Sequence, residues 1–333
     1  MKNEMTYGRM NWIDWMKSVG MYAIVLGHFV PIGYSYLLAF SLPLFFMVSG
    51  FLFRRESDIA LFWRKQWFNL VVPTLIICAL NFSYYCWSHW MEGDFTPLCF
   101  GIFVFDLITG FNDGYRGLAT CWFVYTLLVL RIMLQFVPRR GWGILLVALL
   151  IGAYAFNEYL LPSYRIFLHP NALIDVMIAY PFFLLGYALR RFRKEIDRFQ
   201  HRSALLLMLI ASVMVLHFCV QTNGTAFMHR CHYGESLWLC LLGGVAGAFG
   251  VFSLIKIFTF CPNVIRLIST GTLLILGFHS HLIRIFRQYV SEPSLLDYVV
   301  ALMILAFFVP IILLAMRYFP LIIGKMRVDE LKR

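Results

Sequence analysis

Charged residues are scarce in this sequence. Asp, Glu, Lys and Arg make up only 14% of its 333 residues, whereas hydrophobic residues make up 61%, and the mean hydropathy is +0.76. Soluble domains carry about a quarter charged residues, and the gaps between the apolar stretches leave no room for a recognisable soluble domain. The composition therefore predicts an integral membrane protein.

The apolar stretches lack the apolar–polar alternation of outer-membrane strands and have the length of membrane-crossing helices. Internal repeats and low-complexity tracts are also missing, so we expect one domain over residues 1–333. A cleavable signal is missing too, because the first apolar stretch follows Lys17 without a small-residue cleavage site. We therefore expect a helical membrane bundle that keeps its first helix.

Cysteine motifs for metals or disulfides are absent as well. The eight cysteines form no Cys-x-x-Cys pair, and most lie in apolar stretches, as small core residues do. The sequence therefore predicts no metal site. The net charge of +11 does not indicate a nucleic-acid partner, because Lys and Arg lie in short loops between apolar stretches, as membrane topology requires. We expect contacts with membrane lipids. The sequence leaves open whether the protein forms a homo-oligomer.

The charge of the loops determines the expected topology. About ten apolar stretches approach the roughly 20 residues that cross a membrane, whereas residues 98–111 are typical of a re-entrant or interfacial segment. If that segment does not cross and the N-terminus is cytoplasmic, most Lys and Arg residues fall in inner loops. We therefore predict an all-α polytopic protein of about ten crossings with both termini cytoplasmic. The expected crossings are residues 12–33, 35–53, 67–88, 118–137, 142–161, 172–189, 203–221, 234–258, 264–286 and 296–318. The outer loops then carry Glu92, Asp94, Asn112, Asp113, Tyr115, His169, His229 and His232.

Polar residues in the first expected crossing form the leading candidate site. Lys17 and His28 are eleven residues apart, so on a helix their side chains point within about 20° of the same direction and lie roughly 16 Å apart along the axis. Asp14 lies on the same face. Ionisable residues in a membrane helix indicate function. A neutral His28 can take a hydroxyl proton and return it to a leaving thiol, or it can hydrogen-bond a neighbouring helix. Lys17 can pair with Asp14, extend to the interface, or bind a phosphate-bearing ligand.

Further candidates lie in later apolar stretches or at their ends. Arg64 and Lys65 suit a positive-inside anchor or a site for the phosphates of a cytosolic cofactor. Ser49 and Gly50 either allow close helix packing or form a wall of a cavity that Lys17 and His28 would face. Trp122 is typical of an interfacial anchor, with stacking on a sugar ring as the alternative.

The expected crossing 264–286 carries two histidines, one of which could contact His28. His279 and His281 point about 200° apart on a helix, so at most one should face the interior that His28 faces. His279 and His28 each lie about 20 Å from the inner end of their helix, so contact between them is possible. His217 has no comparable pattern, and we interpret it as a packed histidine.

At these residues the sequence resembles the acyltransferase 3 family of integral membrane acyltransferases, and within it the fucose-4-O-acetylase-type sugar O-acetylases. Matching segments keep their order through nearly the whole chain. They are W-I-D-W-M-K at 12–17, V-L-G-H at 25–28, L-P-L-F-F-M-V-S-G-F at 42–51, V-V-P at 71–73, W-F at 122–123, F-F-L-L-G-Y at 182–187 and L-I-L-G-F-H at 274–279.

The resemblance implies transfer of an acetyl or similar short acyl group from cytosolic acyl-CoA to a hydroxyl of a glycan or lipid-linked sugar. It implies His28 as the catalytic histidine and Lys17 as its basic partner, and we expect the CoA phosphates near Lys17, Arg64 and Lys65. Family members often carry a histidine before Met-Pro in the second crossing, where this chain has Ser41 before Leu42-Pro43. That difference makes His279 a more interesting partner for His28.

Two other functions stay open at this point. A transporter or flippase of a lipid-linked sugar would share the polar interior, although the sequence shows neither inverted repeats nor matched broken helices. A membrane scaffold without catalysis would tolerate substitution of Lys17 and His28. We expect the protein in the inner membrane of a bacterial cell.

Overall fold

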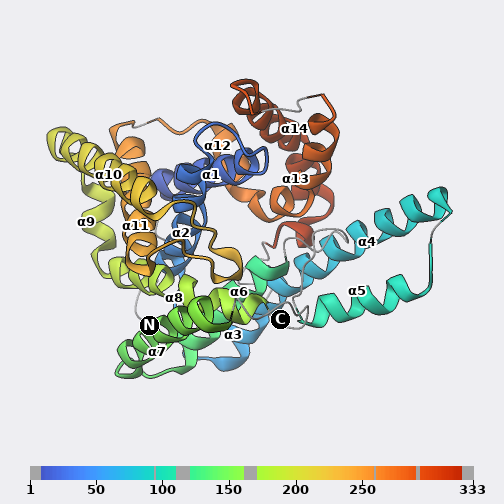
Figure 1. Cartoon of the computed structure of the whole chain (residues 1–333), viewed down its shortest axis with the longest axis horizontal. Coiled ribbons are helices and arrows are strands. Elements are labelled where there is room, and N and C mark those ends of the chain that lie inside the picture. Colours follow the sequence, from blue (N-terminus) through green and yellow to red (C-terminus); the bar gives the residue numbers. More distant parts are fainter. Residues whose placement is uncertain are drawn as a thin grey trace.

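The fold is a bundle of helices (Figure 1). The computed structural model describes residues 9–93, 95–109, 121–160, 171–258, 260–289 and 293–324. Within these ranges no β-strand occurs, and one isolated antiparallel bridge joins Phe227 and His232. The all-α class is therefore confirmed. The helices are α1 (Asn11–Gly27), α2 (Tyr34–Leu52), α3 (Ile59–Gln66), α4 (Val72–Glu92), α5 (Leu98–Thr109), α6 (Cys121–Phe136), α7 (Gly141–Ala155), α8 (Asn171–Leu189), α9 (Arg193–Arg198), α10 (Arg202–Asn223), α11 (Leu237–Ile257), α12 (Asn263–Thr270), α13 (Thr272–Arg287) and α14 (Leu296–Tyr318).

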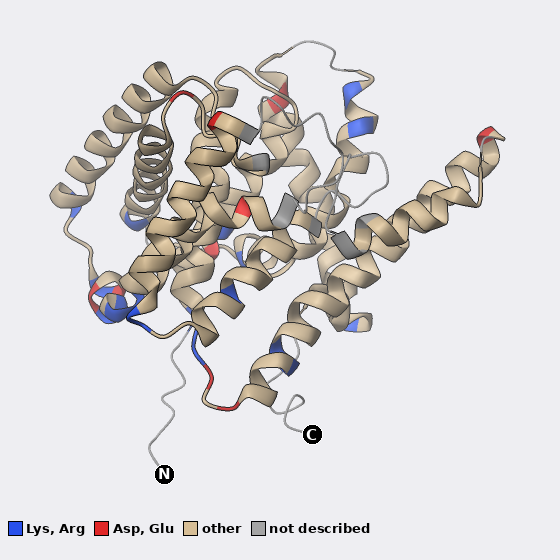
Figure 2. Ribbon diagram, turned by 60° about the horizontal axis from the view of Figure 1, so that its bottom comes forward, with Lys and Arg blue, Asp and Glu red and all other residues tan. Residues whose placement is uncertain are grey.

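Apolar residues cover the outside of the bundle as well as its core. Along α10, Leu207, Val213 and Met214 are more than half exposed. A helix that is apolar on its outer face suits a lipid environment. Lys and Arg are more numerous at the lower end of the view in Figure 2 than at its upper end, which is the kind of asymmetry that the topology prediction assumes.

Seven helical stretches of the described residues are long and apolar enough to cross a membrane. Three other expected crossings coincide with α1, α6 and α13, which have 17, 16 and 16 residues. The count of about ten crossings therefore stays a prediction, and so does the cytoplasmic location of the two termini, which lie outside the described residues.

The first helix is shorter than the expected crossing 12–33, because α1 ends at Gly27. Pro31 disfavours the helical conformation at the preceding residue, and Val30 adopts a φ of 52° instead. Gly33, with a φ of 82°, completes the turn into α2. The prediction of a helix beyond Gly27 was therefore wrong, and His28 lies at the C-terminal end of α1 rather than inside a helix.

The segment 98–111 forms α5, which runs beside α4 away from the other helices (Figures 1 and 2). Its 12 residues extend over about 18 Å, less than the roughly 30 Å of a bilayer core. This length agrees with a segment that does not cross, and its re-entrant path stays a prediction. Residues 110 and 111 lie outside the described part of the chain.

A close approach of two backbones joins α2 to α8. A Cβ atom added at Gly50 would lie 2.0 Å from the carbonyl oxygen of Phe183, and one added at Gly186 would lie 1.9 Å from that of Met47. Only glycine leaves room for such contacts. Of the two interpretations of Gly50, the geometry therefore supports the packing role.

Candidate active site

His28 and His279 lie together in a cavity of about 350 Å³, which we call the His28 cavity. Their ring centroids are 4.9 Å apart. The turn after α1 positions His28, and Arg287 Nη2 donates a hydrogen bond of 2.7 Å to its main-chain carbonyl. The His28 side chain is exposed to the cavity, whereas His279 is buried. The structure thus brings together the two histidines that the sequence singled out.

The surroundings of His279 determine which of its nitrogens holds the proton. Nδ1 lies 3.0 Å from the carbonyl oxygen of Ile275 and 2.9 Å from that of Leu276. Because carbonyl oxygens only accept, Nδ1 is the donor, and Nε2 of the neutral ring is left as an acceptor. Nε2 is buried and has no hydrogen-bond partner among the described residues. Beside His28, this acceptor can hold an N–H group or a substrate hydroxyl.

His281 and His217, the other two histidines that the sequence analysis considered, lie outside the His28 cavity. His281 points away from His28, with Nε2 2.7 Å from Asn81 Oδ1, so the prediction that at most one of the pair faces His28 is confirmed. His217 shares a hydrogen bond of 2.7 Å with the Tyr36 hydroxyl but is exposed, which does not support its interpretation as a packed histidine.

Lys17 lines a second cavity of about 200 Å³ together with Ser49, Asn69 and Arg131, which we call the Lys17 cavity. Lys17 Nζ donates to the main-chain carbonyl of Ser269. Asn69 lies in a π-helical turn, Trp67–Val71, that precedes α4. Widened turns of this kind often occur at functional sites.

Arg131 is a residue of this cavity that sequence reasoning missed. Its Nη1 donates a hydrogen bond of 3.1 Å to Gln66 Oε1, and its buried Nε has no partner in the described ranges. The signal was present in the sequence, because Arg131 is a single arginine in the apolar run of α6, and a lone charge there indicates function.

The two cavities adjoin each other. Ile24, Phe123 and Leu276 line both of them. Ile24 lies seven residues after Lys17 and four before His28, so all three side chains lie on nearly the same face of α1. The shared face that the sequence predicted therefore leads from the Lys17 cavity to the His28 cavity.

Arg64 and Lys65 lie on α3 and are not among the residues that line the Lys17 cavity. Lys65 forms an ion pair with Glu56 at 2.8 Å. Gln66, the next residue, connects α3 to Arg131. A role of Arg64 and Lys65 in binding phosphates stays a prediction.

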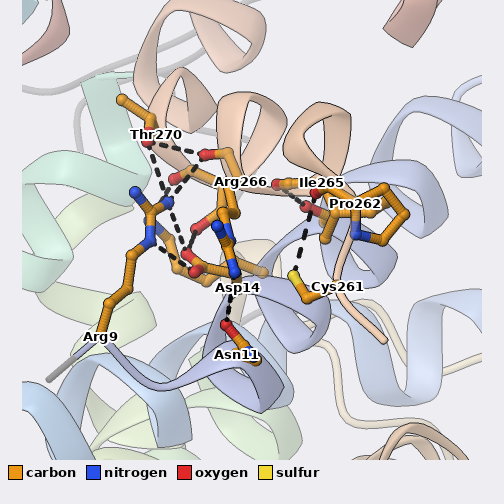
Figure 3. A network of polar contacts seen from close by, with 11 residues as sticks. Arg9, Asn11, Asp14, Cys261, Pro262, Ile265, Arg266 and Thr270 are labelled. Atoms are coloured by element: carbon orange, nitrogen blue, oxygen red, sulfur yellow. Dashed lines mark hydrogen bonds and ion pairs between the residues drawn. The ribbon is translucent and has the colours of Figure 1, made fainter. Parts of the chain in front are cut away.

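Asp14 holds α1 against α12 in the polar network of Figure 3. Its carboxylate accepts hydrogen bonds from Arg9 at 2.6 and 2.9 Å and from the Ser269 hydroxyl at 2.6 Å. The hydrogen bond with Asp14 raises the pKa of Arg9 above its ordinary value. Asp14 is 5% exposed, so it has a structural role and stabilises the segment that bears Lys17.

Replacing Asp14 with Ala should lower the free energy of unfolding by about 2 kcal/mol, because the buried Ser269 hydroxyl and the half-exposed Arg9 lose a charged acceptor. Thermal unfolding in detergent measures the effect. The exposed acid Glu195 provides the control, since Glu195→Gln should leave the unfolding temperature unchanged. An unchanged unfolding temperature for Asp14→Ala would contradict the structural role.

A third histidine faces the His28 cavity from the loop between α10 and α11. His229 lines the cavity and stacks on Trp122, with ring centroids 4.4 Å apart. Its Nδ1 lies 2.8 Å from Oδ2 of Asp175, which is fully buried in α8. Sequence reasoning placed His229 only in an outer loop, because nothing in the spacing pairs it with Asp175. The loop residues Asn112, Asp113, Tyr115 and His169 lie outside the described residues.

The arrangement provides an imidazole pair in a largely apolar cavity and a cationic second cavity beside it, which suits transfer of a group between an anionic ligand and a hydroxyl. The family model Acyl_transf_3, an acyltransferase domain, matches residues 10–315. No curated protein and no solved structure matches the chain. The matched range includes every residue of the two cavities named above except those of the C-terminal segment after α14. The chain is thus an integral membrane acyltransferase and belongs to the acyltransferase 3 family.

Proposed function

We propose that the protein transfers an acyl group, an acetyl group in the simplest case, from cytosolic acyl-CoA to a hydroxyl of a glycan or lipid-linked sugar. The observation that carries this proposal is that the two cavities share part of their lining, and we propose that a passage joins them. Lys17 and Arg131 lie at one end, the His28–His279 pair lies at the other, and apolar side chains of Ile24, Phe123 and Leu276 lie between.

The chemistry of acyl-CoA fits the two ends of this passage. Its phosphates are anionic and suit the cations of Lys17 and Arg131. Its pantetheine arm is long and narrow and carries the thioester at its tip, so an arm in the passage brings the thioester to His28. We further propose that Arg64 and Lys65, on the helix that Gln66 connects to Arg131, contact phosphates that stay outside the Lys17 cavity.

His28 supports the transfer by one of two routes. As a general base, its imidazole takes the proton of the acceptor hydroxyl while the oxygen attacks the thioester carbonyl. The carbon–sulfur bond then breaks, the ester forms, and the proton passes to the CoA thiolate. As a nucleophile, the imidazole first attacks the thioester carbonyl, the carbon–sulfur bond breaks and CoA thiolate leaves; the acyl-imidazole then passes the acyl group to the hydroxyl, whose proton balances the thiolate. In either route the acceptor nitrogen of His279 can orient His28.

Purified protein in proteoliposomes, supplied with acetyl-CoA and extracted membrane glycolipids, tests the proposal. We expect free CoA to be released with the appearance of an acetylated product. Movement of a sugar lipid across the bilayer without acetyl-CoA consumption would instead indicate a transporter.

The donor end can be tested separately. Lys17→Met and Arg131→Met should each raise the KM for acetyl-CoA by about tenfold, equivalent to ~1.4 kcal/mol of binding free energy, because each removes a charge that faces the donor phosphates. Initial rates of CoA release at varied acetyl-CoA measure this. The matched control is Arg139→Met, which removes an exposed arginine outside both cavities and should leave the KM unchanged. A KM within twofold of wild type for both cavity variants would rule out this donor site.

A further inference from the structure

We propose that His229 and Trp122 form the acceptor subsite of the His28 cavity, with Asp175 orienting His229 from behind, and that this subsite takes the hydroxylated ring of a sugar. This inference rests on the proposed acyl transfer, and it assigns the acceptor, the second substrate of that reaction, to one side of the His28 cavity. Asp175 and His229 position the acceptor, while His28 and His279 serve the reaction.

The contact between Asp175 and His229 sets the hydrogen-bonding character of the histidine. An ionised carboxylate only accepts, so Nδ1 of His229, 2.8 Å from Asp175 Oδ2, holds a proton. Nε2 is then an acceptor in the neutral ring, and the hydrogen bond that the described residues give this ring is the one from Nδ1 to Asp175. Since His229 lines the cavity, this nitrogen can accept the hydroxyl proton of a ligand bound there.

The loop that bears His229 is fixed by its own hydrogen bonds. Asn223, at the end of α10, is buried; its Nδ2 donates to the carbonyl of Tyr233 at 2.6 Å, and its Oδ1 accepts from the amide of Ser236 at 2.5 Å. The amide of Phe227 donates to the carbonyl of His232 at 2.7 Å. His229 therefore reaches the cavity from a preorganised turn, as a residue that positions a ligand must.

The lining of the cavity matches the surface of a sugar. A pyranose ring presents C–H groups on its faces and hydroxyls at its edge. Trp122 and Phe227 supply aromatic surface beside His229, and the other polar side chains that face the cavity are those of Tyr34, Ser41 and Ser280, besides the histidine pair. Aromatic surface with a few convergent polar groups is typical of a small-molecule site.

The imidazoles of the cavity come from different parts of the fold. His28 follows α1, His279 lies on α13 and His229 lies in the loop after α10. The rings of His28 and His279 contact each other, whereas the ring of His229 contacts the carboxylate of Asp175.

The test compares transfer to sugar with transfer to water. Purified protein in detergent is given labelled acetyl-CoA with each of four probes, the methyl pyranosides of glucose, galactose, mannose and fucose. For the best acceptor, His229→Ala should raise the KM for the sugar at least tenfold and change kcat less than threefold. Slow CoA release without sugar should fall much less than transfer to sugar does. Asp175→Asn should act in the same direction, and the double variant should be no worse than His229→Ala, because Asp175 acts through His229.

Controls separate the possible failures. His217→Ala removes a histidine outside the cavity and should leave both rates unchanged, and Trp122→Phe should weaken sugar binding less than Trp122→Leu does. Acetylation of glycerol but of none of the pyranosides would overturn the sugar assignment. Equal loss of sugar transfer and water-dependent CoA release in His229→Ala, at an unchanged unfolding temperature, would overturn the positioning role. Absence of CoA release by the wild-type protein would instead refute the proposed function itself.

Discussion

Replacing His28 with Ala should lower the rate of acyl transfer by about 10³-fold or more, because the variant loses both the general base and the nucleophile of the two proposed routes. The His28 side chain is exposed to its cavity rather than packed in the core, so its removal should cost little stability. The main-chain carbonyl that Arg287 binds is kept in the variant. Initial rates of acetyl-CoA consumption and thermal unfolding in detergent measure the two quantities side by side.

The matched control for His28→Ala is His281→Ala. His281 lies on α13 two residues from His279, but it bonds Asn81 and faces away from His28. We expect this variant to keep most of its transfer activity. A comparable loss of activity in the two variants would indicate that general perturbation of the helices, and not the loss of the imidazole at His28, explains the effect.

Replacing Gly50 with Val should lower the free energy of unfolding by at least about 3 kcal/mol and reduce the yield of folded protein. Any side chain at this position meets the Phe183 carbonyl, which lies 2.0 Å from the site of its Cβ. Because the obstacle is backbone, α2 and α8 would have to separate, and the reciprocal contact at Gly186 would be lost with it. The unfolding temperature and the fraction of monodisperse protein after detergent extraction measure the effect.

A glycine without neighbours provides the comparison. Gly143 in α7 has no heavy atom within 4 Å of an added Cβ. Gly143→Ala should therefore be neutral or slightly stabilising, since alanine favours a helix over glycine. Wild-type stability of Gly50→Val would show that α2 and α8 do not approach as closely as described.

The sequence predicted the features that depend on local pattern. The scarcity of charge and the helical period led to the all-α membrane fold, and the spacing of Lys17 and His28 led to a polar face on α1. Equal depth in two helices made contact between His28 and His279 possible, and the structure places their ring centroids 4.9 Å apart.

Other features depended on contacts between distant parts of the chain. His229 reaches the cavity because Asp175, on another helix, bonds it, and no spacing rule connects these two residues. Likewise, the phase of α8 relative to α2, and not the Ser49-Gly50 pair itself, decides that Gly50 packs while Ser49 lines a cavity.

Two misjudgements had signals in the sequence. The hydropathy of residues 28–33 suggested a continuing helix, but Pro31 and Gly33 end it, with Val30 in an unusual backbone conformation. Arg131 was passed over because a long apolar run surrounds it, although an isolated charge in such a run is costly and for that reason informative.

We propose that this chain moves an acyl group from CoA to a hydroxyl at His28. The most direct test supplies carbon-labelled acetyl-CoA to proteoliposomes that contain wild-type or His28→Ala protein and follows the label into ester-linked acetyl groups of added glycolipid. We predict label in the product with the wild-type protein and none above background with His28→Ala. Equal labelling by the two proteins, or glycolipid that crosses the bilayer without label, would contradict it.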